Sequence, residues 1–351
     1  MIYLCIFIIV IFLSRLAQGG RPNNVFFLFL AALPLILMAG YRDISVGSDT
    51  GAYPVQVYEN RQNYEFNLIS SIEPLYSFLG YVVYKMNGDF NTLLLLTHSL
   101  IIGFFCIGFW RLRNTAPLWL MMFFFCFLFY NMSLQLSRQS VAVAIVFWGS
   151  TYLMEKRIWI FLGAIVIGIL FHKSAVTAIL LIPFYYRESR KLQLLMLFGS
   201  IAGLLFYNIF LSNLTSVQVF EKYESYAEGA KFEGQLSSSE FIIRIVFLFV
   251  LYLWGGKKIS SPVLTLFLME FIINLFQIRS RFVGRMGMYI YVLYFFYLPL
   301  VMTSKQRNIK RILPIIKIAV FSITIFYWWL VYIDHVAGET YPYSSKILGI
   351  D

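Results

Sequence analysis

Charged residues are scarce in this chain. Asp, Glu, Lys and Arg together make up 13% of its 351 residues, whereas a soluble domain carries roughly 25%. Hydrophobic residues make up 60%, and no polar run is long enough to form a separate soluble domain. The composition therefore excludes an ordinary soluble enzyme. It predicts one transmembrane domain, residues 1–351.

Cysteine is also rare. Cys5, Cys106 and Cys126 lie inside apolar runs and lack the spacing of metal ligands, so neither a zinc site nor a disulfide framework is supported. The net charge of +11 would suit nucleic acid in a soluble chain. In a membrane chain it reflects basic cytoplasmic loops, and nucleic acid is not an expected partner.

Long apolar runs dominate the sequence. Runs of 15–20 residues fit spanning helices and not barrel strands, so we predict an all-α polytopic membrane protein with about 12 transmembrane helices. The first charge, Arg15, follows the first run rather than preceding it, which favours an uncleaved helix over a signal peptide. The expected spans are residues 2–18, 25–41, 91–110, 116–132, 138–154, 158–172, 174–187, 192–211, 240–255, 260–278, 286–303 and 311–334.

Short basic loops indicate the orientation of these spans. They hold 15 of the 28 basic residues and only two acids, Glu155 and Glu188. The positive-inside rule places them in the cytoplasm, so both termini and the outer loops 42–90 and 212–239 lie outside. The basic residues are Arg15, Arg21, Arg111, Arg113, Lys156, Arg157, Arg187, Arg190, Lys191, Lys257, Lys258, Lys305, Arg307, Lys310 and Arg311.

Residues 73–87 form an additional apolar stretch that does not fit this alternation of inner and outer loops. If the stretch crossed the membrane, every later basic loop would change sides. It is short and begins with Glu73 and Pro74. We therefore predict a re-entrant or interfacial helix on the outer side, which forms a lid or wall of the site together with the loop 42–72.

Unusual charges gather at the outer edges of the spans. Arg138 and Gln139 open one span, and Arg279, Arg281 and Arg285 precede another. Arginines at a helix start bind anions, and phosphates above all. The alternative is that they contact lipid headgroups or the membrane interface.

A second group of polar residues opens the first outer loop, residues 41–53. Asp49 and Asp43 suit a base or an acceptor of sugar hydroxyls, and Arg42 suits phosphate. Gly47 and Gly51 allow tight backbone geometry. The alternative is a capped turn with a local Arg–Asp pair.

Histidine and buried carboxylate provide the remaining candidates. His172, in the turn between two short spans, suits proton transfer near neutral pH; the alternative is a cap of that turn. His98 and His335 are expected to be structural. Glu270 lies near the middle of a span, and we favour a structural ion pair over a proton-coupled role.

Four motifs follow one another along the chain. The pattern is Arg-Asp-x-x-x-Gly-x-Asp-Thr-x-x-Tyr, Glu-Pro-x-Tyr, Arg-Gln and Phe-His-x-Ser-Ala. Here it reads from Arg42 to Tyr53, from Glu73 to Tyr76, at Arg138 and Gln139, and from Phe171 to Ala175. In these motifs residues 40–185 resemble the EpsG-like branch of the Wzy-type polysaccharide polymerases. The C-terminal half matches only as a hydrophobic pattern with a basic outer cluster.

The resemblance implies an inverting, metal-independent glycosyltransferase with a GT-C-like fold and no cofactor. Such enzymes join undecaprenyl-pyrophosphate-linked repeat units at the outer, periplasmic face of the bacterial cytoplasmic (inner) membrane. The product becomes O-antigen, capsule or exopolysaccharide. A flippase and a chain-length regulator are expected partners beside the lipid-linked glycan and the membrane lipid.

The residues then divide by expected role. His172 is the first choice for the base and Asp49 the second, with holding the acceptor sugar as an alternative role for Asp49. The pyrophosphate ligands are Arg42, Arg138, Arg279, Arg281 and Arg285. The sugar ligands are Asp43, Tyr53, Glu73 and Gln139.

Two other functions compete with polymerisation. An O-antigen ligase would move a finished glycan onto another acceptor. A flippase or transporter would carry charged residues along a pathway open to both faces, whereas the unusual charges here cluster at the outer edge, with Glu270 as the exception.

Overall fold

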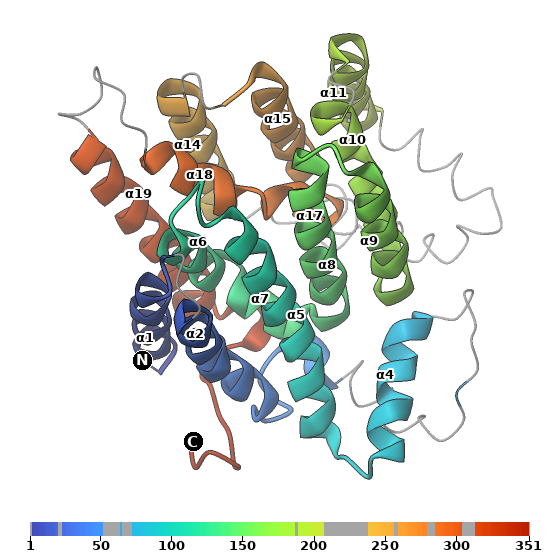
Figure 1. The fold of residues 1–351 in the computed structure, drawn as a ribbon, viewed down its shortest axis with the longest axis vertical. Coiled ribbons are helices and arrows are strands. Elements are labelled where there is room, and N and C mark those ends of the chain that lie inside the picture. Colours follow the sequence, from blue (N-terminus) through green and yellow to red (C-terminus); the bar gives the residue numbers. More distant parts are fainter. Residues whose placement is uncertain are drawn as a thin grey trace.

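The computed structural model describes residues 2–19, 23–51, 64, 72–186, 189–206, 238–255, 259–278, 285–303 and 313–350. Within these ranges the chain is helical and has no β-strand, and one isolated bridge joins Ser345 to Ile350. The predicted all-α class is thereby confirmed for the described part of the chain. Figure 1 shows a bundle of tilted helices.

The helices follow the expected apolar runs closely. In the first half they are α1 (Ile2–Leu16), α2 (Asn23–Gly40), α4 (Pro74–Lys85), α5 (Phe90–Leu112), α6 (Leu118–Phe125), the π-helix η1 (Cys126–Tyr130), α7 (Asn131–Gln135), α8 (Ser137–Met154), α9 (Ile158–Phe171), the 3₁₀-helix η2 (Lys173–Leu181), α10 (Ile182–Tyr185) and α11 (Arg190–Leu205). In the second half they are α14 (Ser238–Gly255), α15 (Ser261–Leu275), η6 (Phe276–Ile278), α17 (Met288–Tyr291), α18 (Tyr294–Met302), α19 (Leu313–Trp328), the π-helix η8 (Trp329–Asp334) and η9 (Ala337–Glu339).

Local sequence explains where some helices begin. Asp89 accepts a hydrogen bond from the Thr92 backbone N–H at 2.8 Å, and the Thr92 hydroxyl accepts one from the Asp89 N–H, forming a capping box for α5. Ser189 caps α11 with a single bond, because its hydroxyl oxygen accepts from the Leu192 backbone N–H at 3.4 Å. Pro74 occupies the first turn of α4, where its missing N–H costs nothing.

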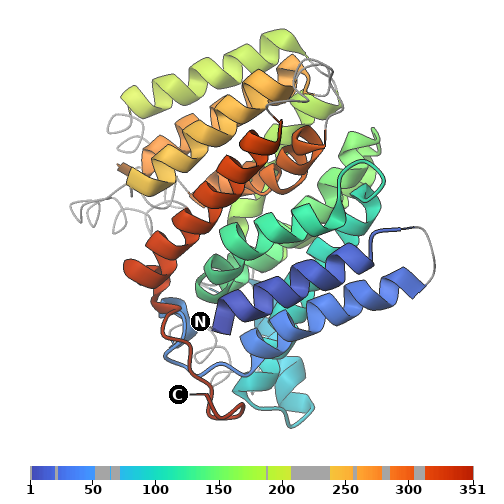
Figure 2. The same ribbon diagram turned by 90° about the vertical axis from the view of Figure 1, so that its left-hand side faces the viewer.

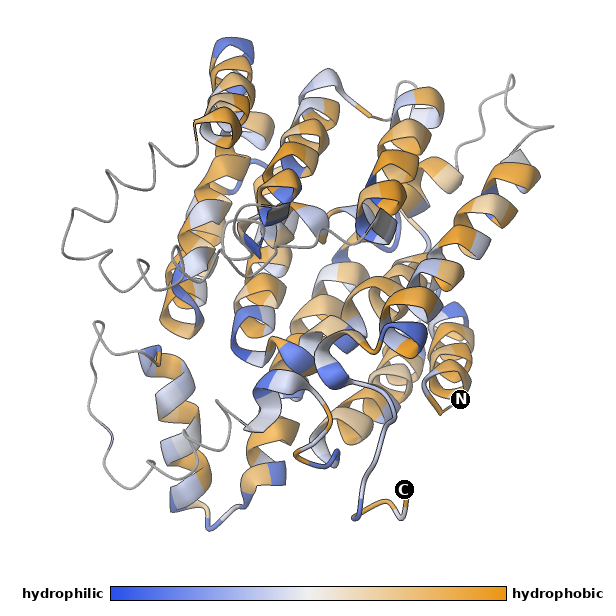
Figure 3. Ribbon diagram, turned by 180° about the vertical axis from the view of Figure 1, so that it is seen from behind, coloured by the Kyte–Doolittle hydropathy of each residue, from blue (hydrophilic) through white to orange (hydrophobic). Residues whose placement is uncertain are grey.

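Among the residues that the structure describes, three helical segments are long and apolar enough to cross a membrane, namely Phe90–Leu112, Leu118–Gln135 and Pro314–Asp334. Shorter apolar helices accompany them, and Figure 3 shows the hydrophobic colour extending along most of the bundle. The described helices therefore fit a membrane protein. The number of about 12 spans stays a prediction.

Aromatic side chains form the interior of the bundle. Phe105 of α5 packs against Phe125, Phe129, Phe147 and Phe295 at centroid distances of 4.9–6.0 Å. The aromatic stripes 123–125 and 289–297 are also buried within the protein, where close packing supplies the attraction that lipid does not.

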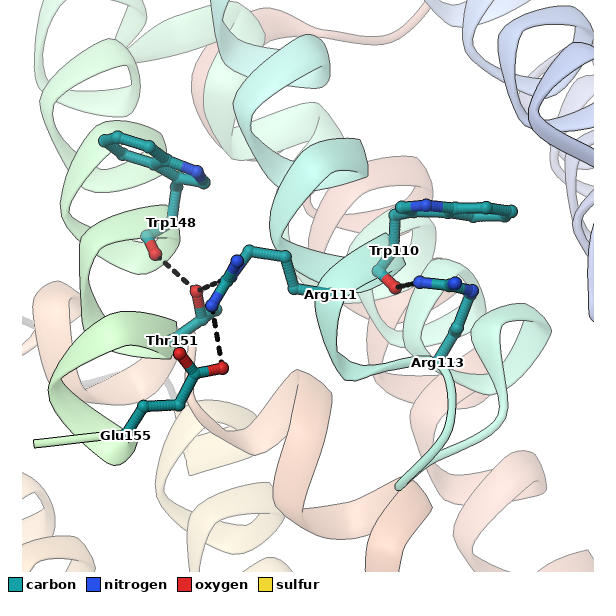
Figure 4. A network of polar contacts seen from close by, with 6 residues as sticks. All are labelled: Trp110, Arg111, Arg113, Trp148, Thr151 and Glu155. Atoms are coloured by element: carbon teal, nitrogen blue, oxygen red, sulfur yellow. Dashed lines mark hydrogen bonds and ion pairs between the residues drawn. The ribbon is translucent and has the colours of Figure 1, made fainter. Parts of the chain in front are cut away.

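The described basic residues Arg111, Arg113 and Lys156, from two of the expected cytoplasmic loops, lie at one end of the bundle, here called the basic end. Arg111 donates to Thr151 at 2.9 Å and to Glu155 at 2.7 Å, so the end of α5 is tied to the end of α8 (Figure 4). Arg113 stacks on Trp110. Gln18, after α1, donates to the Arg113 carbonyl at 2.9 Å.

The opposite end, here called the motif end, holds both termini. The Tyr3 hydroxyl donates to the Thr340 carbonyl at 2.5 Å, so the start of α1 lies beside the C-terminal segment. Figure 2 shows the two ends of the chain close together. Both termini were expected on one side of the membrane, and they do lie at one end of the bundle.

The segment 73–87 does not cross the bundle. Glu73, before α4, contacts the start of α8, and Asn91, in the first turn of α5, donates to the Gly40 and Arg42 carbonyls at 2.9 and 3.2 Å. Both flanks of α4 are therefore at the motif end. In Figure 1, α4 lies at the edge of the molecule beside the lower part of α5. This agrees with the expectation that α4 is not a span.

Candidate functional site

Glu73 brings three of the four motifs together. Its Oε2 accepts a hydrogen bond from Arg138 Nη1 at 2.5 Å, and its Oε1 accepts one from the Lys173 backbone N–H at 3.3 Å. These partners are 65 and 100 residues away in sequence. Glu73 was predicted to hold sugar. The structure shows it buried, with both carboxylate oxygens engaged by the protein.

Arg138 lies in the first turn of α8, where backbone N–H groups are not used by the helix. Its ion pair with Glu73 is largely shielded, because the two side chains are 12% and 6% exposed. Such a pair fixes the direction of the guanidinium. Removing one member of a buried pair typically costs about 3–5 kcal/mol, so Glu73 positions Arg138.

Gln139 links this region to the following arginine cluster. Its Nε2 donates to the Arg285 carbonyl at 3.0 Å. The predicted sugar ligand is thus engaged with backbone, and it brings Arg285 beside the start of α8. Arg285 itself is half-buried.

Asp49 lies in the same electrostatic environment. Burial raises the pKa of the Asp49 carboxyl, while nearby Arg285 and Arg138, and a hydrogen bond from Ser48, act in the opposite direction. A partly buried carboxylate with a raised pKa is a stronger base than a solvated one. The structure therefore groups Asp49 with two of the predicted pyrophosphate ligands.

His172 lies between α9 and η2 and belongs to the same cluster. Burial lowers its pKa to about 4, a shift that Glu73 opposes and that Arg138 and Arg285 reinforce. The imidazole is therefore neutral at pH 7. Its Nδ1 is 2.6 Å from the Ser174 hydroxyl, which is 2.9 Å from the Tyr289 hydroxyl.

Arg42 has a different environment from Arg138. It is fully buried and contacts the Ala39, Val46 and Leu134 carbonyls, the Thr50 hydroxyl and His98 Nε2 at 2.8–3.2 Å. A guanidinium has five N–H donors, and these five partners occupy them. The prediction that Arg42 binds pyrophosphate is therefore replaced by a structural role. His98 is structural, as expected.

Asp43 is also engaged by the protein. Its Oδ1 accepts from the Lys346 backbone N–H at 3.0 Å, and its own N–H donates to the Ser344 carbonyl at 3.0 Å. The local Arg42–Asp43 pair considered from the sequence is not formed. Instead, the C-terminal segment 337–350 binds the loop that carries Asp49, and the role of Asp43 as a sugar ligand stays a prediction.

Several other expectations have separate outcomes. Tyr53, Arg279 and Arg281 lie outside the described residues. Glu270 pairs with Arg244 of α14 at 3.0 Å, which confirms the favoured structural ion pair. Within the described ranges, no three His, Cys, Asp or Glu side chains gather as a metal site would.

Sequence reasoning missed Tyr289. It lies in an aromatic run that resembles a membrane-facing stripe, so its hydroxyl attracted no attention. Its position could have indicated a role at the site, because Tyr289 follows Arg285 by four residues, which is one helical turn, and the two therefore share a helix face.

The comparison with known families gives a match over most of the chain. The family model described as "EpsG family" matches residues 25–345. The chain belongs to the EpsG family. This EpsG membership points to a membrane protein of polysaccharide biosynthesis, a glycosyltransferase-like polymerase. No curated protein and no solved structure matches the chain significantly.

Proposed function

We propose that this EpsG-family chain polymerises undecaprenyl-pyrophosphate-linked oligosaccharide repeat units at the outer face of the bacterial cytoplasmic membrane. The observation that carries the proposal is the grouping of Arg138, Arg285, Asp49 and His172 at the motif end. Arginines there suit the pyrophosphate, and a carboxylate or imidazole suits the acceptor hydroxyl. Arg281 and Arg279, four and six residues before Arg285 in the sequence, extend the same basic segment.

The chemistry needs no metal. Departure of a pyrophosphate from an anomeric carbon builds negative charge, and prepositioned guanidinium groups stabilise that charge. Arg138 is suited to this role because Glu73 holds it in place. A base removes the proton of the acceptor hydroxyl, which attacks from the opposite face and inverts the anomeric centre.

Cells without this protein provide the first test. Loss of a polymerase leaves a single repeat unit on the final acceptor, because flipping and ligation continue without it. Gel analysis of the surface glycan is expected to show this product. Complete loss of surface glycan would instead identify a flippase or a ligase, the two alternatives.

Arg138→Lys tests the site itself. Lysine retains the charge but lacks the planar fork that binds two phosphate oxygens at once, so polymerisation in vitro is expected to fall by about 10²-fold. The control is Arg113→Lys at the basic end, which should retain activity at equal expression. Full activity of Arg138→Lys would contradict a pyrophosphate site at this position.

A further inference from the structure

We infer that His172 donates a hydrogen bond through Nε2 rather than acting as the base, that Ser174 and Tyr289 position it, and that Asp49 is the base. The identity of the substrate in this inference rests on the proposed function. The state of the imidazole does not, because it follows from the hydrogen bonds around the ring.

The backbone shows which ring nitrogen accepts. The Ser174 N–H donates to His172 Nδ1 at 3.4 Å, and a backbone N–H has no lone pair with which to accept. Nδ1 must therefore present its own lone pair. The Ser174 hydroxyl, 2.6 Å from the same nitrogen, is then also a donor.

The Tyr289 hydroxyl supports the same direction of donation along the hydrogen bonds that join Tyr289, Ser174 and His172. This hydroxyl is 2.9 Å from Ser174 Oγ, so Tyr289 donates to Ser174 and Ser174 donates to Nδ1. The reverse order would leave the Tyr289 hydroxyl hydrogen without an acceptor among the described residues. It would also require a proton on His172 Nδ1, so that the Nδ1–H group and the Ser174 backbone N–H would point at each other.

A neutral imidazole carries one proton, and an accepting Nδ1 places it on Nε2. Nε2 has no hydrogen-bond partner within the described part of the chain, and the ring is within electrostatic reach of Arg138 and Arg285. The N–H therefore serves the same anion as the arginines. Taking up a second proton is opposed by burial, since the pKa of His172 is lowered to about 4.

Asp49 is then the remaining candidate base, because its carboxyl is within electrostatic reach of the same Arg138 and Arg285. The acceptor oxygen forms a bond to the anomeric carbon, and the bond from that carbon to the pyrophosphate oxygen breaks with its electron pair. The acceptor proton passes to the Asp49 carboxylate. His172 keeps its proton and shares it with a pyrophosphate oxygen, so that charge and atoms balance without a further reagent.

The tautomer is measurable without any substrate. The chain has three histidines, so ¹⁵N spectra of the full-length, histidine-labelled protein can be assigned by subtracting the spectrum of His172→Gln. At pH 7, Nδ1 is expected to be unprotonated and Nε2 protonated. Tyr289→Phe should weaken this preference, whereas Tyr291→Phe, on the same short helix, should not. A protonated Nδ1 in the wild-type protein would overturn the inference.

Turnover of lipid-linked repeat units gives the second readout. Gln offers an N–H donor near the position of Nε2 but no base. His172→Gln is therefore expected to retain activity within about tenfold of wild type, while His172→Ala loses about 10²-fold. Asp49→Asn should lose about 10²–10⁴-fold. Near-normal activity of Asp49→Asn, or equal inactivity of the Gln and Ala variants of His172 when both are folded, would overturn the assignment.

A positioning role for Tyr289 predicts a specific change in the kinetic constants. Tyr289→Phe is expected to lower kcat by about tenfold with KM unchanged, and Tyr291→Phe to leave both constants as in the wild type. Loss of kcat in both tyrosine variants would mean that α17 matters only for folding. If wild-type protein polymerises nothing while the tautomer is as inferred, the proposed function fails and the assignment of the imidazole stands.

Discussion

Two arginines with the same sequence signal have different surroundings in this protein. Arg42 and Arg138 each begin a motif at the motif end. Arg42 is enclosed by five acceptors, whereas Arg138 pairs with the Glu73 carboxylate and is within electrostatic reach of Asp49 and His172. Side-chain surroundings, rather than position in a motif, therefore distinguish these two arginines.

Replacing Arg42 by Lys is expected to destabilise the folded protein. Lysine has a compact ammonium that cannot reach acceptors on both sides of the loop, and buried carbonyls are left unpaired at about 1–3 kcal/mol each. The unfolding temperature in detergent should fall clearly. Arg138→Lys should keep its fold and lose turnover. The assignment of a structural role would be wrong if Arg42→Lys were as stable as the wild type.

The decline of turnover at low pH is expected to result from protonation of Asp49. Burial raises the pKa of Asp49, so as the pH falls through this value the carboxylate takes up a proton and turnover declines. His172, with a pKa of about 4, stays neutral from pH 5 to 8. Measuring kcat/KM against pH tests this. An inflection near pH 6.5 that disappears in His172→Gln would restore His172 as the base.

At the scale of elements, the loop that carries Asp49 is fixed by a close backbone approach. Gly47 has φ +96°, and its N–H donates to the Glu339 carbonyl at 2.8 Å. A Cβ at this position would lie 2.8 Å from the Leu134 carbonyl oxygen. The C-terminal segment and α7 therefore hold the loop from two sides.

Gly47→Ala should disturb this loop, because an L-residue at this φ is strained by roughly 1–3 kcal/mol. Gly51→Ala is the matched control, since a Cβ there meets nothing within 4 Å. Polymerisation and unfolding temperature should both decrease for Gly47→Ala and remain near wild type for Gly51→Ala. Equal behaviour of the two variants would contradict the importance of the close approach.

The pair between α14 and α15 gives a second prediction for the elements. Arg244 donates to Glu270 at 3.0 Å, and the two side chains are 6% and 1% exposed. Arg244→Met alone should cost about 3–5 kcal/mol, because it leaves a buried carboxylate without its partner. The double variant Arg244→Met/Glu270→Leu should recover most of this loss in thermal unfolding. A double variant no better than the single one would show that the pair is not the source of the effect.

At the scale of the whole molecule, the two ends of the bundle should lie on opposite sides of the membrane. Cysteines introduced at the exposed positions Lys85 and Lys346, at the motif end, are expected to react with an impermeant reagent applied from outside the cell. A cysteine at Asn114, at the basic end, should react only after permeabilisation. Labelling of Lys85→Cys solely from the cytoplasm would reverse the predicted orientation.

Sequence by itself determined the membrane class, the helical class, the positions of nearly all helices and the EpsG family. These properties depend on apolar-run length, capping residues and short motifs, all of which are local. It also grouped Arg138, Asp49 and His172 correctly, because topology assigned them to one side.

Only the tertiary structure decided which motif residues are available to a ligand. Glu73 and Arg42 have their polar side-chain atoms engaged by partners up to 100 residues away, one Asp43 carboxylate oxygen accepts from Lys346 across 303 residues, and Tyr289 reaches Ser174 across 115 residues. Such contacts depend on how the helices pack against one another. The direction of the hydrogen bonds around His172, and hence the nitrogen that carries its proton, follows from that packing.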